Sequence, residues 1–159
     1  MQRYAKLMKN DIVDGEGICV SLWTQGCPHR CAGCHNPETW DFNGGEEIPN
    51  DIKNEIITAI SANGIMRNFS VLGGEPLCKE NRAFVRQIVQ SVRVCYPAIK
   101  IFLWTGYLYE DLLEENDSDI DLILECVDTL IDGPYMQEER DITLPLCGSR
   151  NQRVLNLKE

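Results

Sequence analysis

The chain carries, at residues 18–34, the stretch ICVSLWTQGCPHRCAGC, which joins an apolar run to three cysteines. The apolar run, residues 18–23, is rich enough in β-branched and large apolar residues to predict a buried strand. Cys27, Cys31 and Cys34 follow in a Cys-x3-Cys-x2-Cys spacing, so one loop after that strand offers three thiolates to one metal centre. Structural zinc sites usually have four protein ligands, whereas reactive sites keep one position open. The loop therefore predicts a metal centre with a free coordination position.

Strand and helix patterns alternate along the rest of the chain. Further strands are predicted at residues 69–72, 99–104, 127–131 and, as an edge strand, 153–157, with helices at 49–64, 84–92 and 108–113. The acidic stretch around 114–121 predicts an exposed loop. Because strand-helix-strand crossovers are right-handed, the alternation predicts a mostly parallel sheet. At 159 residues the chain is too short for a closed eight-stranded barrel of about 250, so we expect an α/β fold: a partial, open (β/α) barrel forming a single domain over residues 1–159.

The loops that follow the predicted strands carry the polar and glycine-rich residues. Gly73-Gly74-Glu75-Pro76 follows one strand, Thr105-Gly106-Tyr107 the next and Asp132-Gly133-Pro134-Tyr135 the last of the parallel set. In parallel α/β proteins, ligands bind outside the carboxyl ends of the strands. We therefore expect these loops and the cysteine loop to form one site, with Thr105 and Asp132 as further candidates for lining it.

The composition is that of a folded domain outside membranes. Hydrophobic residues make up 43% and charged residues 25%, with a formal net charge of -10 and scattered basic residues. This balance disfavours nucleic acid as a partner. The N-terminus has no apolar segment typical of a signal peptide, and no stretch reaches the ~20 apolar residues that span a bilayer. We expect a cytoplasmic protein that does not bind membranes.

Five cysteines lie outside the 27–34 loop. Without an export signal, reduced thiols are expected, and free cysteine in an apolar setting behaves as a small buried hydrophobe. We give this structural role to Cys19, Cys78, Cys95, Cys126 and Cys147.

Three thiolates suit a 4Fe-4S cluster, because each cysteine binds one iron and the fourth iron can accept an external ligand. Two alternatives remain open on spacing alone. His29 or His35 could complete a Cys3His zinc site, and Cys31 with Cys34 could form a dithiol redox pair. The helix that usually follows such a pair is unfavourable here, because Pro37 comes three residues later.

The cysteine spacing resembles that of the radical S-adenosylmethionine (SAM) enzymes. The segment 73–76 resembles the motif with which those enzymes hold the methionyl amino group. Five longer stretches narrow this resemblance, at residues 11–15, 25–27, 34–37, 104–107 and 148–152. Through them the chain resembles, over nearly its whole length, the activating proteins of anaerobic ribonucleoside-triphosphate reductases.

This resemblance implies a specific reaction. A reduced 4Fe-4S cluster gives one electron to SAM, which splits into methionine and a 5'-deoxyadenosyl radical, and the radical takes a hydrogen from a glycine of the reductase. The implied partners are the glycine loop of the reductase large subunit and a small reducing protein such as flavodoxin or ferredoxin. An incomplete barrel would leave one side open for that loop.

The resemblance also implies roles for individual residues. Cys27, Cys31 and Cys34 would bind the cluster, and Gly73, Gly74 and Glu75 would face the methionyl end of SAM. The backbone around the last ligand, at Gly33, Cys34 and His35, would contact the adenine.

The chain departs from the family at three positions. Cys19 and Cys147 stand where arginine is common, and His35 replaces a frequent aromatic residue. The two cysteines are either neutral replacements or a pair that approach each other or a second metal. The functional alternatives are an activase of another glycyl radical enzyme, of the formate-lyase type, and a non-catalytic zinc-binding module.

Overall fold

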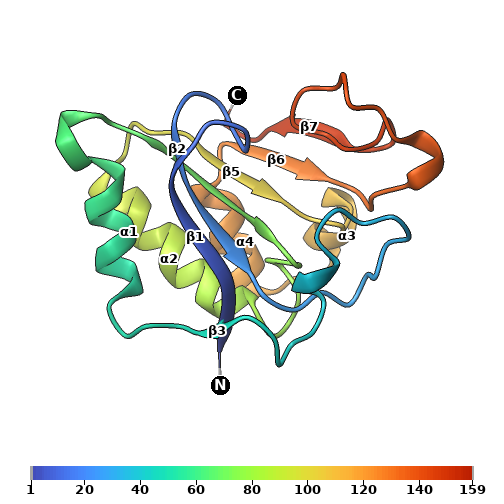
Figure 1. The fold of residues 1–159 in the computed structure, drawn as a ribbon, viewed down its shortest axis with the longest axis horizontal. Coiled ribbons are helices and arrows are strands. Elements are labelled where there is room, and N and C mark those ends of the chain that lie inside the picture. The colour runs from blue at the N-terminus through green and yellow to red at the C-terminus, as the bar shows by residue number, and fades with distance from the viewer. Residues whose placement is uncertain (1, 159) are drawn as a thin grey trace.

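The computed structural model describes residues 2–158, which form one mixed sheet in the order β3-β1-β2-β4-β5-β6-β7 (Figure 1). The strands are β1 (Arg3–Asp11), β2 (Cys19–Thr24), β3 (Glu46–Glu47), β4 (Asn68–Gly73), β5 (Ile101–Trp104), β6 (Thr129–Asp132) and β7 (Arg153–Asn156). The helices are α1 (Ile52–Ile60), α2 (Arg82–Cys95), α3 (Tyr109–Glu114) and α4 (Ser118–Cys126). Short 3-10 turns lie at Pro37–Thr39, Ala62–Gly64 and Gln137–Glu139.

The centre of the sheet is parallel and its margins are antiparallel. Strands β2, β4, β5 and β6 pair in parallel, as the alternating pattern predicted. Strands β1 and β3 at one margin and β7 at the other pair antiparallel, so the predicted edge strand near the C-terminus is confirmed. The prediction of a mostly parallel sheet is correct for the centre alone, because no strand was predicted at residues 3–11. The sheet is open, and the partial (β/α) barrel stays a prediction.

The hydrophobic core lies between the sheet and the helices, which cover one of its faces (Figure 1). Alternate strand residues such as Leu22, Val71 and Leu103 belong to this core and are fully buried. Side chains alternate between the two faces of a strand, so Trp23, Leu72 and Trp104 point to the other face. They line a cavity there. The helices thus cover one face of the sheet, and the cavity lies on the other.

Helix α4 was not predicted, because its sequence was treated as part of an exposed acidic loop. Ile120, Ile123 and Leu124 recur at helical spacing and are buried against the core. The side chain of Asp117 accepts hydrogen bonds from the backbone N–H groups of Asp119 and Ile120, at 2.9 and 3.1 Å. This N-cap and the apolar spacing were present in the sequence, and the density of acidic residues obscured them.

Replacing Asp117 by alanine should therefore lower the free energy of unfolding at pH 7 by about 1 kcal/mol, the usual contribution of an N-cap. The hydrogen bond from the Ile120 N–H and the contact with Arg82 lower the pKa of Asp117. A lowered pKa stabilises the fold above the ordinary value of 3.8 and loses this effect as the pH falls through the folded-state value. Urea unfolding of the variant and the parent should thus differ at pH 7 and converge at acid pH. Asp121→Ala, at an exposed position of the same helix, should change stability little, and a loss equal to that of Asp117→Ala would contradict the capping role.

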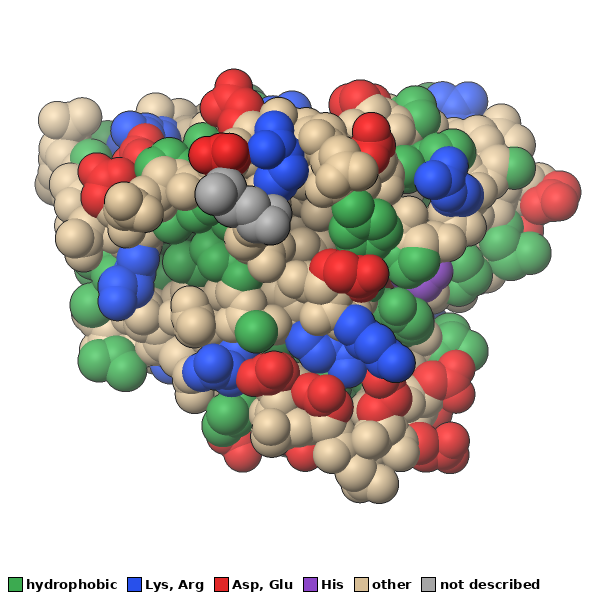
Figure 2. Space-filling view, turned by 90° about the horizontal axis from the view of Figure 1, so that it is seen from below, with side chains coloured by type: hydrophobic (Ala, Val, Ile, Leu, Met, Phe, Trp, Pro, Cys, Tyr) green, Lys and Arg blue, Asp and Glu red, His purple; other side chains and the backbone are tan. Residues whose placement is uncertain are grey.

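Basic and acidic side chains lie next to one another on the face that Figure 2 shows. Arg82 is within 3.2 Å of Glu115 and 3.1 Å of Asp117, and Arg86 pairs with Asp119. The scattered basic residues of the sequence are thus partly engaged in pairs that tie α2 to the segment around α4. Within residues 2–158, no helix has the length and apolar character needed to cross a membrane.

Candidate functional site

A cavity of about 370 Å³ opens at the carboxyl ends of the parallel strands. It brings together most of the residues that the sequence singled out for a site. Those that line it are Cys27, Cys31, Cys34, His35, Gly73, Gly74, Glu75 and Thr105. Gly33 and Asp132 do not line it. The volume falls in the range of about 300–1,000 Å³ that small-molecule sites have.

The cysteine loop is fixed at its base by main-chain hydrogen bonds. The N–H of Gly26 donates to the carbonyl of Thr39 at 2.7 Å, and the N–H of Cys27 to that of Trp40 at 3.1 Å. A turn follows, in which the Cys34 N–H donates to the Cys31 carbonyl at 3.1 Å. Gly33 lies inside this turn with φ +76°, a conformation that side chains other than glycine rarely adopt. The loop therefore presents three sulfur atoms from a short, anchored segment.

The loop offers three thiols, which is the donor set that a 4Fe-4S cluster with one open iron takes from a protein. Within residues 2–158, no three His, Cys, Asp or Glu side chains are grouped closely enough to hold one metal ion. In a 4Fe-4S cluster each cysteine binds its own iron, so the thiolates need not converge on one point. Burial raises the pKa of the Cys27 thiol to about 11, and a cationic centre offsets the cost of the thiolate that ligation requires. Three cysteines on one cavity wall are thus compatible with such a cluster.

Gly73 and Gly74 hold the end of β4 against the cysteine loop. Gly73 has φ +110°, and a Cβ at Gly74 would lie 2.5 Å from the Gly26 carbonyl oxygen and 2.9 Å from that of Thr39. The N–H groups of Gly74 and Glu75 donate to the carbonyls of Thr24 and Gly26, at 3.0 and 2.9 Å. The two motifs recognised in the sequence are therefore in direct main-chain contact.

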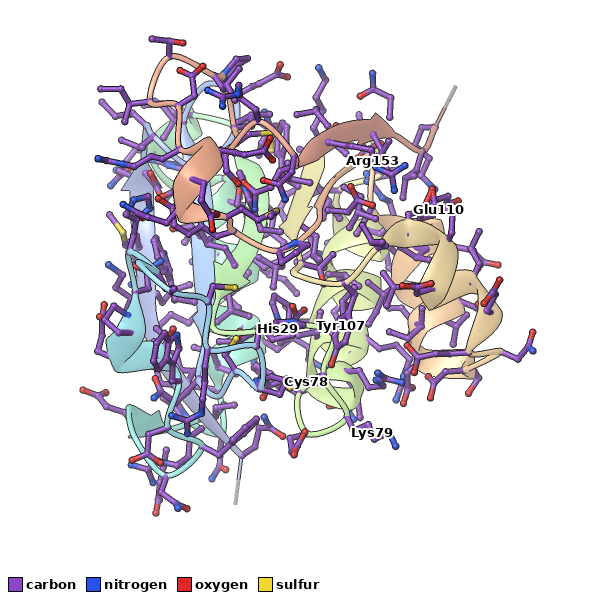
Figure 3. All side chains as sticks on the ribbon, turned by 90° about the vertical axis from the view of Figure 1, so that its right-hand side faces the viewer. His29, Cys78, Lys79, Tyr107, Glu110 and Arg153 are labelled. Atoms are coloured by element: carbon purple, nitrogen blue, oxygen red, sulfur yellow. The ribbon has the colours of Figure 1, made fainter. Side chains whose placement is uncertain are left out.

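The side chain of Glu75 is fully buried and receives four hydrogen bonds. Oε1 lies 2.7 Å from both His29 Nε2 and the N–H of Gly106, and Oε2 accepts from the N–H of Leu77 at 2.9 Å and the hydroxyl of Thr105 at 2.8 Å. His29 also packs edge-on against Tyr107, with ring centroids 4.6 Å apart. The two side chains are labelled in Figure 3. His29 was considered as a zinc ligand from the sequence, and its contact with Glu75 was not foreseen. No spacing rule connects two residues 46 positions apart.

His35 and Gly33 contact the segment after β6. The rings of His35 and Tyr135 have centroids 5.0 Å apart. A Cβ at Gly33 would lie 2.1 Å from Oε1 of Gln137, which itself accepts from the Tyr135 hydroxyl at 2.8 Å. Tyr135, the last residue of the loop that begins at Asp132, lines the cavity although its position in the sequence did not indicate a role there. His35, which stands where the family often has another aromatic residue, thus has Tyr135 as an aromatic neighbour from a different segment.

Asp132 does not line the cavity, contrary to expectation. It is fully buried at the end of β6 and accepts hydrogen bonds from Arg153 Nε at 3.0 Å and from the N–H of Tyr109 at 2.8 Å. Arg153 also forms a two-pronged contact with Glu110 at 2.8 Å (Figure 3). A buried carboxylate needs such a cation, so Asp132 joins β6, β7 and α3.

Asp14 and three tryptophans were missed as cavity residues. Trp23, Trp40 and Trp104 supply apolar walls, and Asp14 lines the cavity from the loop after β1. Burial, together with a hydrogen bond to Asp11 and its charge, raises the pKa of Asp14 to about 7. The sequence indicated the 11–15 stretch through resemblance alone, because the loop joins the end of β1 to the start of β2, at the amino ends of the parallel strands. It reaches β4 from there, where the Ser70 hydroxyl donates to the carbonyl of Asp14 at 2.6 Å.

All eight cysteines are free thiols. Cys19 and Cys78 are buried as expected, Cys126 and Cys147 are half-buried, and Cys95 is exposed, so the expectation of burial was wrong for Cys95. Cys95 is the last residue of α2 and does not belong to its buried face. Cys19 donates to the carbonyl of Glu16 at 3.4 Å, whereas the Asp132 charge adds to the burial that raises the pKa of Cys147. Cys19 and Cys147 thus have different neighbours and form no disulfide.

Comparison with known proteins identifies the family. Residues 13–155 match the family model described as a 4Fe-4S single cluster domain. The chain is 36% identical over 145 residues to the anaerobic ribonucleoside-triphosphate reductase-activating protein of Vibrio cholerae, covering 91% of each chain. It is 35% identical to that of Escherichia coli, over 93% of this chain and 94% of the relative, and 34% identical to that of Enterobacteria phage T4, over 95% and 92%. The chain therefore belongs to the family of anaerobic ribonucleoside-triphosphate reductase-activating proteins, with a 4Fe-4S single cluster domain.

Proposed function

We propose that this protein is a radical SAM activase that generates a glycyl radical on an anaerobic ribonucleoside-triphosphate reductase. The observation that carries the proposal is the shared cavity, in which Cys27, Cys31 and Cys34 face the turn at Gly73 and Gly74. Membership of the family, whose relatives are named as activators of that reductase, favours this partner over other glycyl radical enzymes. The family model for a 4Fe-4S domain favours iron and sulfide over zinc.

The three cysteines would hold the cluster, which when bound supplies one electron to SAM and so yields methionine and a 5'-deoxyadenosyl radical. The glycine of the reductase then loses a hydrogen atom to this radical, leaving 5'-deoxyadenosine and the glycyl radical. In this scheme the chain's own residues position the reactants and exclude water. The tryptophan walls of the cavity would exclude water, because a site closed to water limits side reactions of a reactive intermediate.

We assign the methionyl end of SAM to Gly73, Gly74 and Glu75. Glycine at the first two positions lets the main chain approach a ligand closely, and the carboxylate of Glu75 is the acidic group of the turn that could accept an ammonium group. The adenine is assigned to the turn around Cys34, where Gly33 contributes its backbone and His35 its ring beside Tyr135. Thr105 supports Glu75 through its hydroxyl.

The reductase glycine loop is proposed to reach the cavity from the sheet face that the helices leave uncovered. A small reducing protein such as flavodoxin or ferredoxin would supply the electron. Free thiols at all eight cysteines agree with the reducing cytoplasm in which such donors occur.

Anaerobic reconstitution with iron and sulfide tests this function. The reduced protein should convert SAM to equal amounts of methionine and 5'-deoxyadenosine, and addition of the reductase should produce the electron paramagnetic resonance (EPR) doublet of a glycyl radical. Transfer of the radical to a formate-lyase-type enzyme but not to the reductase would favour the rival activase. Protein that binds zinc, takes up no iron and leaves SAM intact would overturn the proposal.

A further inference from the structure

The Glu75 carboxylate has no acceptor position left for another donor. A carboxylate offers about four lone-pair sites on its two oxygens, and Glu75 receives four hydrogen bonds, two on each oxygen. Its side chain is 1% exposed. An ammonium group that binds Glu75, as the proposed function requires, must therefore replace one of the present donors.

Three of those donors belong to fixed parts of the fold. The N–H groups of Leu77 and Gly106 are main chain. The Thr105 hydroxyl also accepts a hydrogen bond from the N–H of Tyr107 at 3.1 Å, and Thr105 is only 5% exposed. Moving any of them would require the ends of β4 or β5 to move.

His29 is the donor that can leave. Its imidazole is a side chain with two rotatable bonds, it is 19% exposed, and it lines the cavity together with Glu75. It rests on Gly106, where a Cβ would approach His29 Cδ2 to 2.7 Å, and against the ring of Tyr107 (Figure 3). The imidazole, 2.7 Å from Oε1 of Glu75, thus occupies the side of the carboxylate that a donor entering from the cavity would need.

We propose that His29 occupies the position of the SAM amino group on Glu75 and is displaced when SAM binds. This inference rests on the proposed function and adds a residue that sets the affinity for SAM. His29 lies between Cys27 and Cys31, so its release also frees the segment between two cysteines of the cluster loop. A bound imidazole lowers the apparent affinity for SAM, because some of the binding free energy is used to separate it from the carboxylate.

The test measures SAM dissociation constants on anaerobically reconstituted protein with an oxidised cluster, which does not cleave SAM. His29→Phe keeps a ring beside Tyr107 and removes the donor, and it should bind SAM about tenfold more tightly than the parent, as loss of a competing hydrogen bond to a charged group implies. His29→Gln keeps a donor and should bind SAM with nearly the parent affinity. Arg30→Ala changes the same loop at a side chain that faces Trp40 and should leave the constant unchanged.

A SAM analogue that lacks the amino group provides the matched ligand control. It cannot compete with His29, so the parent and His29→Phe should bind it equally. Iron and sulfide content is measured for each variant, and if His29→Phe takes up less than a full cluster, His29→Leu replaces it as the donorless variant. Equal or weaker SAM binding by the donorless variant, while the parent binds SAM, would overturn the role of His29 and leave the proposed function intact. A parent that holds the cluster and binds no SAM would overturn the proposed function itself.

Discussion

Cys31→Ala is expected to abolish both the visible absorption of the iron-sulfur cluster and the formation of 5'-deoxyadenosine. Cys31 is the middle sulfur of a set of three, on a loop whose base is fixed by the hydrogen bonds of Gly26 and Cys27. The loop cannot slide another residue into its place, and an alanine leaves one iron without a protein ligand. Iron and sulfide assays after anaerobic reconstitution, followed by chromatography of the SAM products, provide the measurement. We expect product at the level of the reaction without enzyme.

Cys95→Ala is the matched control, because Cys95 is an exposed free thiol at the end of α2. Its removal should change neither cluster content nor SAM cleavage, and its exposure implies almost no packing cost. Retention of cleavage in Cys31→Ala, or its loss in Cys95→Ala, would show that the cluster ligands have been assigned to the wrong cysteines.

Gly74→Ala should reduce SAM cleavage by about 100-fold, because it forces apart the two motifs that form the cavity. The added Cβ would meet the carbonyl oxygens of Gly26 and Thr39, at 2.5 and 2.9 Å. These atoms are main chain and cannot rotate away, so the cysteine loop has to shift relative to β4. A displacement of about 1 Å at a reacting centre can lower a rate by about 100-fold, and overpacking of this kind typically costs about 1–3 kcal/mol of stability.

Gly64→Ala separates local strain from this clash. Gly64 has φ +72° and no atom within 4 Å of an added Cβ, so the substitution should cost about 1 kcal/mol through backbone strain alone. It should leave cluster uptake and SAM cleavage at parent levels. Product yield under saturating SAM, together with urea unfolding, measures both effects, and a Gly74→Ala protein with parent activity would contradict the close packing described at the turn.

The parallel centre of the fold could be predicted because its signals are local. Apolar runs end at glycine-rich loops in each strand of the set, and crossover handedness then brings those loops to one edge. Strand β1 escaped detection because its residues are mostly exposed or half-buried, so it lacks a continuous apolar run. Helix α4 escaped because acidic residues crowd its first turn, and the contacts of Ile120, Ile123 and Leu124 with the core outweigh that polarity.

The same distinction applies to the site. The three cysteines lie within one short stretch of sequence, and so do the residues of the Gly-Gly-Glu turn. Both sets of residues line the cavity. The contacts of Glu75 with His29 and of Gly33 with Gln137 join segments far apart in the chain, and local sequence patterns give no sign of such contacts. Asp132 was misjudged for the same reason, since its partner Arg153 comes from the antiparallel edge strand.

The main-chain hydrogen bonds that anchor the cysteine loop to Thr39, Trp40 and the turn after β4 join backbone atoms and use no cysteine sulfur. Loop anchoring and cluster ligation therefore draw on different atoms of the same segment, main chain for the one and sulfur for the other. Exposure to oxygen that destroys the inorganic core should leave the scaffold in place with its thiols accessible from the cavity. Repair would then require only fresh iron, sulfide and reducing power, rather than new synthesis of the chain.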